Sequence, residues 1–395
     1  MTDWDFAVIG GGIAGASVAY ELQARAHVVL LEGEAVPGYH TTGRSAAFLV
    51  ESYGTPVVGR LTRAGRSFFE HPPPGFSPVP LVHPRPVLWI AREDQRESLR
   101  AALARGRSAG ADLRSVEGAE AEKRCPVLRS GSVAEAVSEP AAMSIDVAAL
   151  LDGFLRGFRG RGGTVLTRAR VTRIERGEGG FELEAGGRVH RVRGVVDAAG
   201  AWCDTVASLA GVSALGLRPL RRTVITFDPP PDSDLSDWPC VIDADERFYL
   251  KPEGACLLAS PCDETPSEPC DVVPEEYDVA LAVDRIESAT TLRIEHLRRR
   301  WAGLRTFAPD RSPVIGEDPD CPGFFWLAGQ GGFGIMTSPA AARIAASLIL
   351  DRSLPPDVEA LGLTPAALSP ARLRAARGSS APAASPASRS SGSSG

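Results

Sequence analysis

The chain has 395 residues, of which 44% are hydrophobic and 23% charged. This is the composition of a globular protein, and it excludes wholesale disorder and collagen-like repeats. The length predicts two or three domains. The formal net charge of −6 argues against nucleic acid as a partner.

The cysteine pattern and the first residues bear on the location of the protein. The seven cysteines form no C-x-x-C pair, so we expect neither a disulfide framework nor a metal cluster, and a cytoplasmic location is favoured. Residues 1–5 are acidic and run directly into a strand pattern, so no signal peptide is expected. No apolar run reaches the roughly 18 residues that a membrane span needs.

The first 32 residues predict a parallel βαβ unit. Residues 5–9 read as a buried strand, 10–12 as a glycine turn, 13–25 as a helix and 27–31 as a second buried strand. The pattern ends in an acidic residue, Glu32.

Three glycines in this unit match the needs of a dinucleotide diphosphate. Gly10 permits a tight turn, Gly12 lets the backbone approach the diphosphate, and Gly15 lets helix and strand pack closely. Free N–H groups at the helix start would bind the diphosphate. Glu32 lies where a carboxylate accepts from ribose hydroxyls. The alternative is a glycine-rich turn with no ligand.

Further along the chain, a proline-rich stretch at 72–86 suggests a boundary, and 93–107 reads as a surface helix. A second helix follows Ser144, with Ser144 or Asp146 as its cap. Residues 164–198 alternate like a meander of short strands. The later expected elements are strands at 222–227, 247–251, 255–259 and 323–328 and helices at 274–290 and 338–350.

Two later segments favour a flavin over a nicotinamide cofactor. Residues 195–202 form a strand that ends in small side chains, so that a large ring could lie over them. Residues 329–334 are glycine-rich and open a helix, whose positive end suits the electron-rich edge of a reduced flavin. A nicotinamide-dependent dehydrogenase stays open from the first motif alone.

The sequence also resembles a known family. The segments VIGGGIAGASVAYELQ, GYHTTGRSAA, VVDAAGAWCD, RRTVITF, FYLKPEG, WAGLRTFAPD and GQGGFGIMTS are similar to the D-amino-acid oxidase/glycine oxidase superfamily of FAD-dependent oxidoreductases. Within that superfamily they are most similar to D-arginine dehydrogenase. The resemblance runs from about residue 4 to about residue 370, with the motifs in family order.

The resemblance implies an α/β fold of two domains. A Rossmann-like FAD-binding domain would comprise 1–78, 144–218 and 311–370. A substrate domain with an antiparallel sheet would comprise 79–143 and 219–310. The C-terminal tail lies outside the resemblance, and its composition predicts that 371–395 is disordered. FAD is expected to be noncovalent. His40 lies in the expected flavin loop. The implied cofactor contacts are Gly10, Gly12, Ala14, Gly15, Glu32, Thr41, Thr42, Gly43, Arg44, Ser45, Ala46, Ala47, Val171 (through its backbone), Gly200, Trp202, Gly329, Gln330, Gly331, Gly332, Phe333, Gly334 and Ile335.

The implied substrate site is built around two arginines. Arg222 and Arg305 match family residues that hold the substrate carboxylate, which a planar guanidinium binds through paired donors. Tyr53 and Tyr249 match positions that contact the substrate or cover it. Gly303 and Gly332 complete this implied site. The alternative for the two arginines is a surface or interdomain ion pair.

Three positions depart from the family pattern. Val87 stands where the family has an acid for a cationic side chain, Phe48 where it has an active-site histidine, and Val50 where it has a threonine. An unpaired buried cation is costly, so D-arginine is not the expected substrate. The changes favour an apolar side chain.

The resemblance therefore implies oxidative deamination of a D-amino acid with an apolar side chain. Hydride would pass to flavin N5, and the imino acid would hydrolyse to a 2-oxo acid and ammonia. No residue is assigned as catalytic acid or base. The alternatives are a secondary amine, a glycine-type substrate or a 2-hydroxy acid in the same superfamily, or a flavin-binding protein without catalysis. The electron acceptor, a quinone or O2, stays open.

Overall fold

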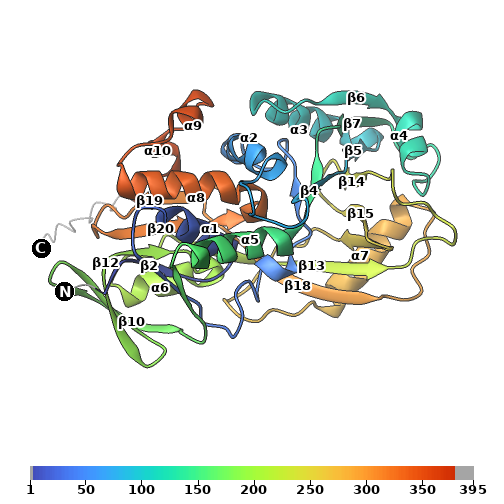
Figure 1. The fold of residues 1–395 in the computed structure, drawn as a ribbon. Coiled ribbons are helices and arrows are strands. Elements are labelled where there is room, and N and C mark those ends of the chain that lie inside the picture. Colours follow the sequence, from blue (N-terminus) through green and yellow to red (C-terminus); the bar gives the residue numbers. More distant parts are fainter. Residues whose placement is uncertain (1–2, 379–395) are drawn as a thin grey trace, which may run out of the picture.

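The computed structural model describes residues 3–378, and it contains two large β-sheets that lie next to each other (Figure 1). The first sheet has a parallel core in the order β12–β1–β2–β9, with β20 parallel to β12 on its other side. The antiparallel meander β10–β11–β12 and strand β19 extend it. Its strands are β1 (Trp4–Ile9), β2 (Val28–Leu31), β9 (Thr164–Leu166), β10 (Val171–Gly177), β11 (Gly180–Ala185), β12 (Arg188–Asp197), β19 (Val314–Glu317) and β20 (Phe324–Ala328).

The predicted βαβ unit is confirmed. Strand β2 is buried along its whole length, as expected for a parallel strand covered on both faces. Helix α1 (Ile13–Leu22) follows the glycine turn and packs against α5 (Val147–Gly160) and α8 (Gly334–Leu350). The cap of α5 is Asp146 and not Ser144, because the Asp146 Oδ1 atom accepts the N–H of Ala149 at 2.8 Å.

Helix α8 begins at Gly334, four residues before the predicted start. It contains Pro339, which cannot donate to the carbonyl of Ile335 four residues earlier. The Ser338 hydroxyl donates to that carbonyl at 2.9 Å instead. This substitute hydrogen bond allows the helix to begin upstream of the proline.

The second sheet has ten strands in the order β21–β18–β13–β16–β15–β14–β5–β7–β6, with β17 beside β13. It is antiparallel apart from the parallel pair β5–β14. Helix α7 (Glu276–Ala289) packs on it, beside β13. Its strands are β5 (Val87–Ala91), β6 (Arg114–Glu117), β7 (Glu135–Glu139), β13 (Arg218–Phe227), β14 (Cys240–Asp243), β15 (Tyr249–Glu253), β16 (Cys256–Ser260), β17 (Thr265–Pro266), β18 (Arg299–Phe307) and β21 (Gln330–Gly331).

A small third sheet, β3–β8–β4, and several helices complete the fold. Helix α2 was missed by the sequence pattern, although Thr55 caps it and proline occupies its first position. These elements are β3 (Phe48–Leu49), β4 (Val82–Pro84), β8 (Met143–Ile145), α2 (Pro56–Glu70), α3 (Arg96–Ser108), α4 (Gly118–Arg124), α6 (Cys203–Leu209), α9 (Pro356–Ala360), α10 (Pro365–Leu368), η1 (Thr42–Arg44), η2 (Glu93–Gln95) and η3 (Gly200–Trp202).

The prediction of a disordered segment from residue 371 onward is wrong for its first part. Helix α11 (Ala371–Gly378) is formed there. Arg372 is bonded to Asp310 at 2.7 Å and Arg374 to Asp318 at 2.5 Å. Residues 379–395 lie outside the described part of the chain. The division into domain segments that the resemblance implies remains our proposal.

All seven cysteines are free thiols. Within residues 3–378, no helix is both long and apolar enough to cross a lipid bilayer.

Candidate active site

A cavity of about 500 Å³ is lined by residues of both large sheets and their loops. It begins at the glycine turn after β1 and reaches strands β13–β15 and β18 of the second sheet. Most of the expected site residues line it. They are Gly10, Gly12, Ala14, Glu32, Thr41, Thr42, Arg44, Ser45, Ala46, Ala47, Phe48, Tyr53, Val171, Gly200, Trp202, Arg222, Tyr249, Gly303, Arg305, Gln330, Gly331, Gly332, Gly334 and Ile335.

The glycine turn is built without room for side chains. Gly10 has a φ of +102°, and a Cβ there would lie 2.6 Å from the carbonyl oxygen of Ala198. A Cβ on Gly12 would lie 3.1 Å from the Thr42 hydroxyl. The first turn of α1 contains no acidic residue, and its N-cap offers no side-chain hydrogen bond. A ligand can therefore come close to the backbone of this turn, next to the positive N-terminal end of α1. Such a position suits a phosphate.

Glu32 is held rigidly at the end of β2. Its Oε2 atom accepts the N–H of Gly11 at 2.6 Å, and its Oε1 atom accepts the N–H of Glu34 at 2.7 Å. Glu34 in turn accepts from the ring of His40 at 3.1 Å, and that ring lies 4.7 Å from the ring of Trp202. These side chains line the end of the cavity where the sequence predicted the ribose.

Replacing Glu32 with glutamine is expected to raise the dissociation constant for FAD about tenfold. A glutamine has one acceptor oxygen, so one of the two backbone N–H groups would face the amide NH2 group, a loss of about 1–2 kcal/mol. Titration of the apoprotein with FAD measures the constant. Glu93→Gln, at an exposed position, should leave it unchanged, and equal constants for both variants would contradict a role for Glu32.

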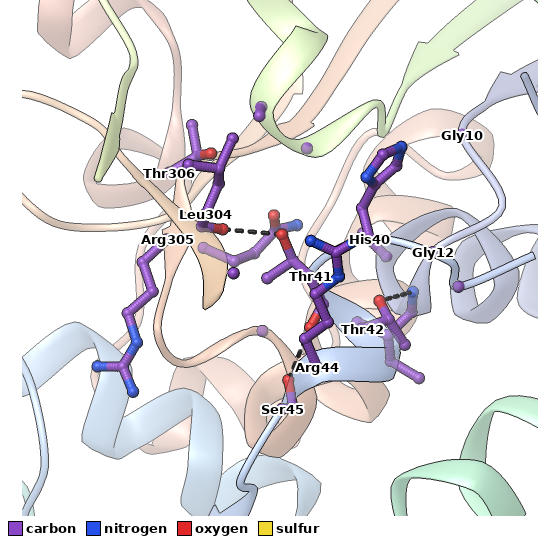
Figure 2. A pocket seen from close by; sticks show the side chains of 18 of the residues that line it. Gly10, Gly12, His40, Thr41, Thr42, Arg44, Ser45, Leu304, Arg305 and Thr306 are labelled. Atoms are coloured by element: carbon purple, nitrogen blue, oxygen red, sulfur yellow. Dashed lines mark hydrogen bonds between the residues drawn. The ribbon is translucent and has the colours of Figure 1, made fainter. Parts of the chain in front are cut away.

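The loop of residues 41–47 is fastened to β18 of the second sheet. The Thr41 hydroxyl donates to the carbonyl of Leu304 at 2.8 Å, and the Trp301 indole donates to the carbonyl of Arg44 at 3.0 Å. The Arg44 guanidinium donates to the Ala302 carbonyl at 3.1 Å. In Figure 2 this loop lies between the Gly10–Gly12 turn on one side and Arg305 on the other. It therefore connects the glycine turn of the first sheet with the arginine-bearing strand of the second sheet.

Arg222 and Arg305 point to the same face of the second sheet. In the register of β13 and β18, Arg222 lies opposite Gly303, and Arg305 lies opposite Leu220. Gly303 and Arg305 are two residues apart, so they share a face. Both arginines line the cavity. The neighbouring Arg221 points to the other face, where it pairs with Asp278 of α7 at 2.9 Å.

Arg222 is fixed in place and keeps one nitrogen free. Its Nε atom donates to the Asp263 carbonyl at 2.8 Å, and its Nη2 atom lies 3.3 Å from Glu264 Oε1. Only 4% of the residue is exposed, yet Nη1 has no hydrogen-bond partner among the described residues. A buried donor without a partner is costly. We therefore infer that Nη1 donates a hydrogen bond to a ligand when one is bound.

Two tyrosines flank the arginines. The Tyr53 hydroxyl accepts from Arg305 Nη1 at 3.1 Å. Burial raises the pKa of Tyr53, and it raises the pKa of Tyr249 to about 12, although Arg305 opposes both shifts. Both phenols are therefore protonated at neutral pH. Since Tyr53 accepts from Arg305, its own hydrogen is available to a bound anion.

Five expected site residues do not line the cavity: Gly15, Gly43, Val87, Gly329 and Phe333. Gly15 allows close packing instead, because a Cβ there would lie 1.8 Å from the carbonyl oxygen of Gly10. Phe333 is buried and packs against Tyr53. Val87 is fully buried between β14 and β7, and its neighbour Cys240 lines the cavity in its place.

The sequence analysis missed several lining residues of the second sheet and its loops. Glu246 and Cys262 adopt positive φ angles of 53° and 54° in turns, which no sequence pattern announced. The other missed residues could have been found only from the pairing of β13, β14 and β15. The missed lining residues of this region include Val224, Cys240, Ile242, Glu246 and Cys262. Met336 of α8 also lines the cavity and was not predicted.

Comparison with known proteins agrees with this geometry. A family model described as DAO, an FAD-dependent oxidoreductase, matches residues 5–348. The hydrogen cyanide synthase subunit HcnC of Pseudomonas aeruginosa is 26% identical, over 53% of this chain and 49% of that protein. Glycine oxidase of Geobacillus kaustophilus is 23% identical, over 91% of this chain and 97% of the relative.

Solved structures show the same fold. L-Proline dehydrogenase from P. horikoshii superposes with a TM-score of 0.81 at 20% identity, covering 95% of this chain and 99% of that one. Glycine oxidase from Bacillus cereus superposes with a TM-score of 0.75 at 21% identity, covering 90% and 98%. The fold and the cavity thus define an FAD-dependent oxidoreductase. The chain belongs to the DAO family, and the predicted fold class and cofactor are confirmed.

The residues present fit FAD. The glycine turn leaves a cradle that a side chain would fill, and Ala198, Ala199 and Gly200 at the end of β12 are small. Helix α8 also begins at the cavity without an acidic residue or a side-chain cap in its first turn. Its positive end therefore faces the cavity unopposed. The assignment of single residues to parts of the cofactor remains our proposal.

Proposed function

We propose that the protein oxidises an amino acid, with Arg222 and Arg305 holding the α-carboxylate. The unpartnered Nη1 atom of the buried Arg222, in a cavity that also contains Arg305, is the observation that carries this proposal. Two guanidinium groups on one face of a sheet offer a carboxylate several charge-assisted hydrogen bonds. The same observation argues against a protein without catalysis, because an idle buried cation would be a liability.

The contribution of the chain is positioning. The arginines fix the carboxylate, and the Tyr53 and Tyr249 hydroxyls limit its orientation. The Cα–H bond of the bound substrate is therefore held in a single orientation. FAD, when bound, accepts hydride at N5. The amine must be neutral before that transfer, and we propose that it loses its proton to solvent, because no lining residue is assigned as a base. Water then hydrolyses the imino acid to a 2-oxo acid and ammonia.

The apolar side-chain end of the cavity supports the preference for an uncharged side chain. Phe48, Val50, Val224, Cys240 and Ile242 line it together. We propose a D-amino acid, following the resemblance, with noncovalently bound FAD. The reduced cofactor would pass its electrons to a quinone or to O2.

An anaerobic panel tests the proposal. The purified holoprotein is mixed with D- and L-amino acids, and the loss of flavin absorbance is followed. We expect apolar D-amino acids to reduce the flavin fastest. The proposal would be wrong if no amino acid bleached the flavin.

The second candidate class comprises secondary amines, glycine-type substrates and 2-hydroxy acids. The carboxylate clamp would serve each of them equally well, and the glycine oxidases among the relatives favour this class. Adding glycine, N-methyl amino acids and hydroxy acids to the same panel separates it from the first.

A further inference from the structure

Lys251 lies directly behind the apolar end of the cavity. It is one of only two lysines in the chain, and 3% of it is exposed. Its Nζ atom lies 4.7 Å from the centroid of the Phe48 ring. Phe48 lines the cavity and Lys251 does not, so the ammonium group lies against the ring of a residue of the cavity wall.

The register of the second sheet explains this placement. Val241 pairs with Leu250 and Ile242 with Tyr249, so Cys240 lies across from Lys251. Side chains alternate along a strand, so Lys251 shares the face of Tyr249. Cys240, Ile242 and Tyr249 line the cavity, and Lys251 therefore belongs to the face that forms its wall.

The charge of Lys251 is incompletely compensated. Its one ion pair among the described residues is with Glu253 at 2.5 Å, and the Glu253 side chain is 50% exposed. Water screens an exposed carboxylate more than a buried ammonium. Burial raises the pKa values of Tyr53 and Cys262, and the Glu246 carboxylate, which lines the cavity, adds to both shifts. Burial also raises the pKa of Cys240, and there the Lys251 charge opposes the shift.

We propose that Lys251 determines substrate specificity by excluding cationic side chains from the Phe48 end of the cavity and favouring neutral or anionic ones. The inference rests on the proposed function, since it concerns the side chain of the same substrate. A ring that already carries a cation on one face attracts a second cation weakly on the other. The two positive charges also repel each other across a site of low dielectric constant.

Two substitutions of opposite sign test the inference. The measured quantity is kcat/KM for lysine divided by kcat/KM for norleucine, in the enantiomer that the enzyme accepts. Lys251→Met removes the charge and keeps an unbranched apolar chain, so the ratio should rise about tenfold. Glu253→Gln removes the compensating charge, so the ratio should fall. The ratio of glutamate to glutamine should move in the opposite direction in each variant.

Matched controls separate charge from structure. Lys251→Arg keeps the charge and should keep the wild-type ratios. Lys123→Met changes an exposed lysine that does not line the cavity, and it should also keep them. If Lys251→Met does not fold, Glu253→Gln still decides, because its side chain is half exposed. Ratios within twofold of wild type in the charge-removing variants would overturn the inference. Failure of the proposed function looks different, because no amino acid would then reduce the wild-type flavin.

Discussion

Replacing Arg305 with methionine is expected to lower kcat/KM for the amino acid about 100- to 1000-fold, mainly through KM. The substitution removes one of the two guanidinium groups that would bind the carboxylate and leaves the Tyr53 hydroxyl without its donor. Loss of one member of a buried charge-assisted pair costs about 3–4 kcal/mol, which corresponds to this factor. Steady-state kinetics with the best substrate of the panel measures it.

The matched control for Arg305 lies on the same strand. Arg300 also belongs to β18, but its side chain is 47% exposed and pairs with Glu276 on the surface. Arg300→Met should change kcat/KM less than about twofold, because exposed ion pairs contribute little. Similar losses in the two variants would mean that Arg305 acts through the strand and not through the substrate.

Replacing Gly10 with alanine is expected to weaken FAD binding by about 100-fold or more. The added Cβ would lie 2.6 Å from the carbonyl oxygen and 2.9 Å from the Cα atom of two residues that follow β12. These are backbone atoms, so relief requires the turn to move away from the diphosphate site. The φ of +102° adds strain for any residue with a side chain. FAD content after purification and FAD titration of the apoprotein measure the effect.

Gly75 provides the control for backbone strain alone. It has a φ of +75°, and a Cβ there would meet nothing within 4 Å. Gly75→Ala should therefore lower the free energy of unfolding by about 1 kcal/mol and leave FAD binding intact. If Gly10→Ala bound FAD as tightly as Gly75→Ala, the turn would not be the diphosphate site.

The local patterns sufficed for the βαβ unit of the first sheet. Strand, glycine turn, helix and second strand follow one another within 32 residues, and each obeys a short-range rule of periodicity or backbone conformation. The position of Glu32 was predicted for the same reason, since this residue directly follows β2. In this unit, the local sequence is enough to predict where each residue lies in the fold.

The orientation of the arginines in the second sheet could not be predicted from local patterns. Arg221 and Arg222 are adjacent and chemically identical, and only the pairing of β13 with β18 decides that Arg222 faces the cavity while Arg221 faces α7. The resemblance to a family chose between them, and the residue pattern did not. The resemblance did not serve equally well for Val87. It placed this residue in the substrate site, but Val87 is fully buried and does not line the cavity.

Long-range contacts explain the remaining miss. Composition predicted that the chain is disordered from residue 371, yet Arg372 and Arg374 bind acids more than 50 positions earlier in the sequence. These ion pairs hold the start of α11 against Asp310, which follows β18, and Asp318, which follows β19. No property of residues 371–378 by themselves reveals those partners.

The proposed function requires that the two arginines present the α-carbon of a carboxylate substrate to bound FAD. The most direct measurement compares anaerobic flavin reduction by an amino acid and by its amide, which lacks only the carboxylate charge. We expect the acid to reduce wild-type flavin at least about 100-fold faster than the amide, and we expect Arg305→Met to remove most of this difference. Equal rates for acid and amide in the wild-type protein would contradict it.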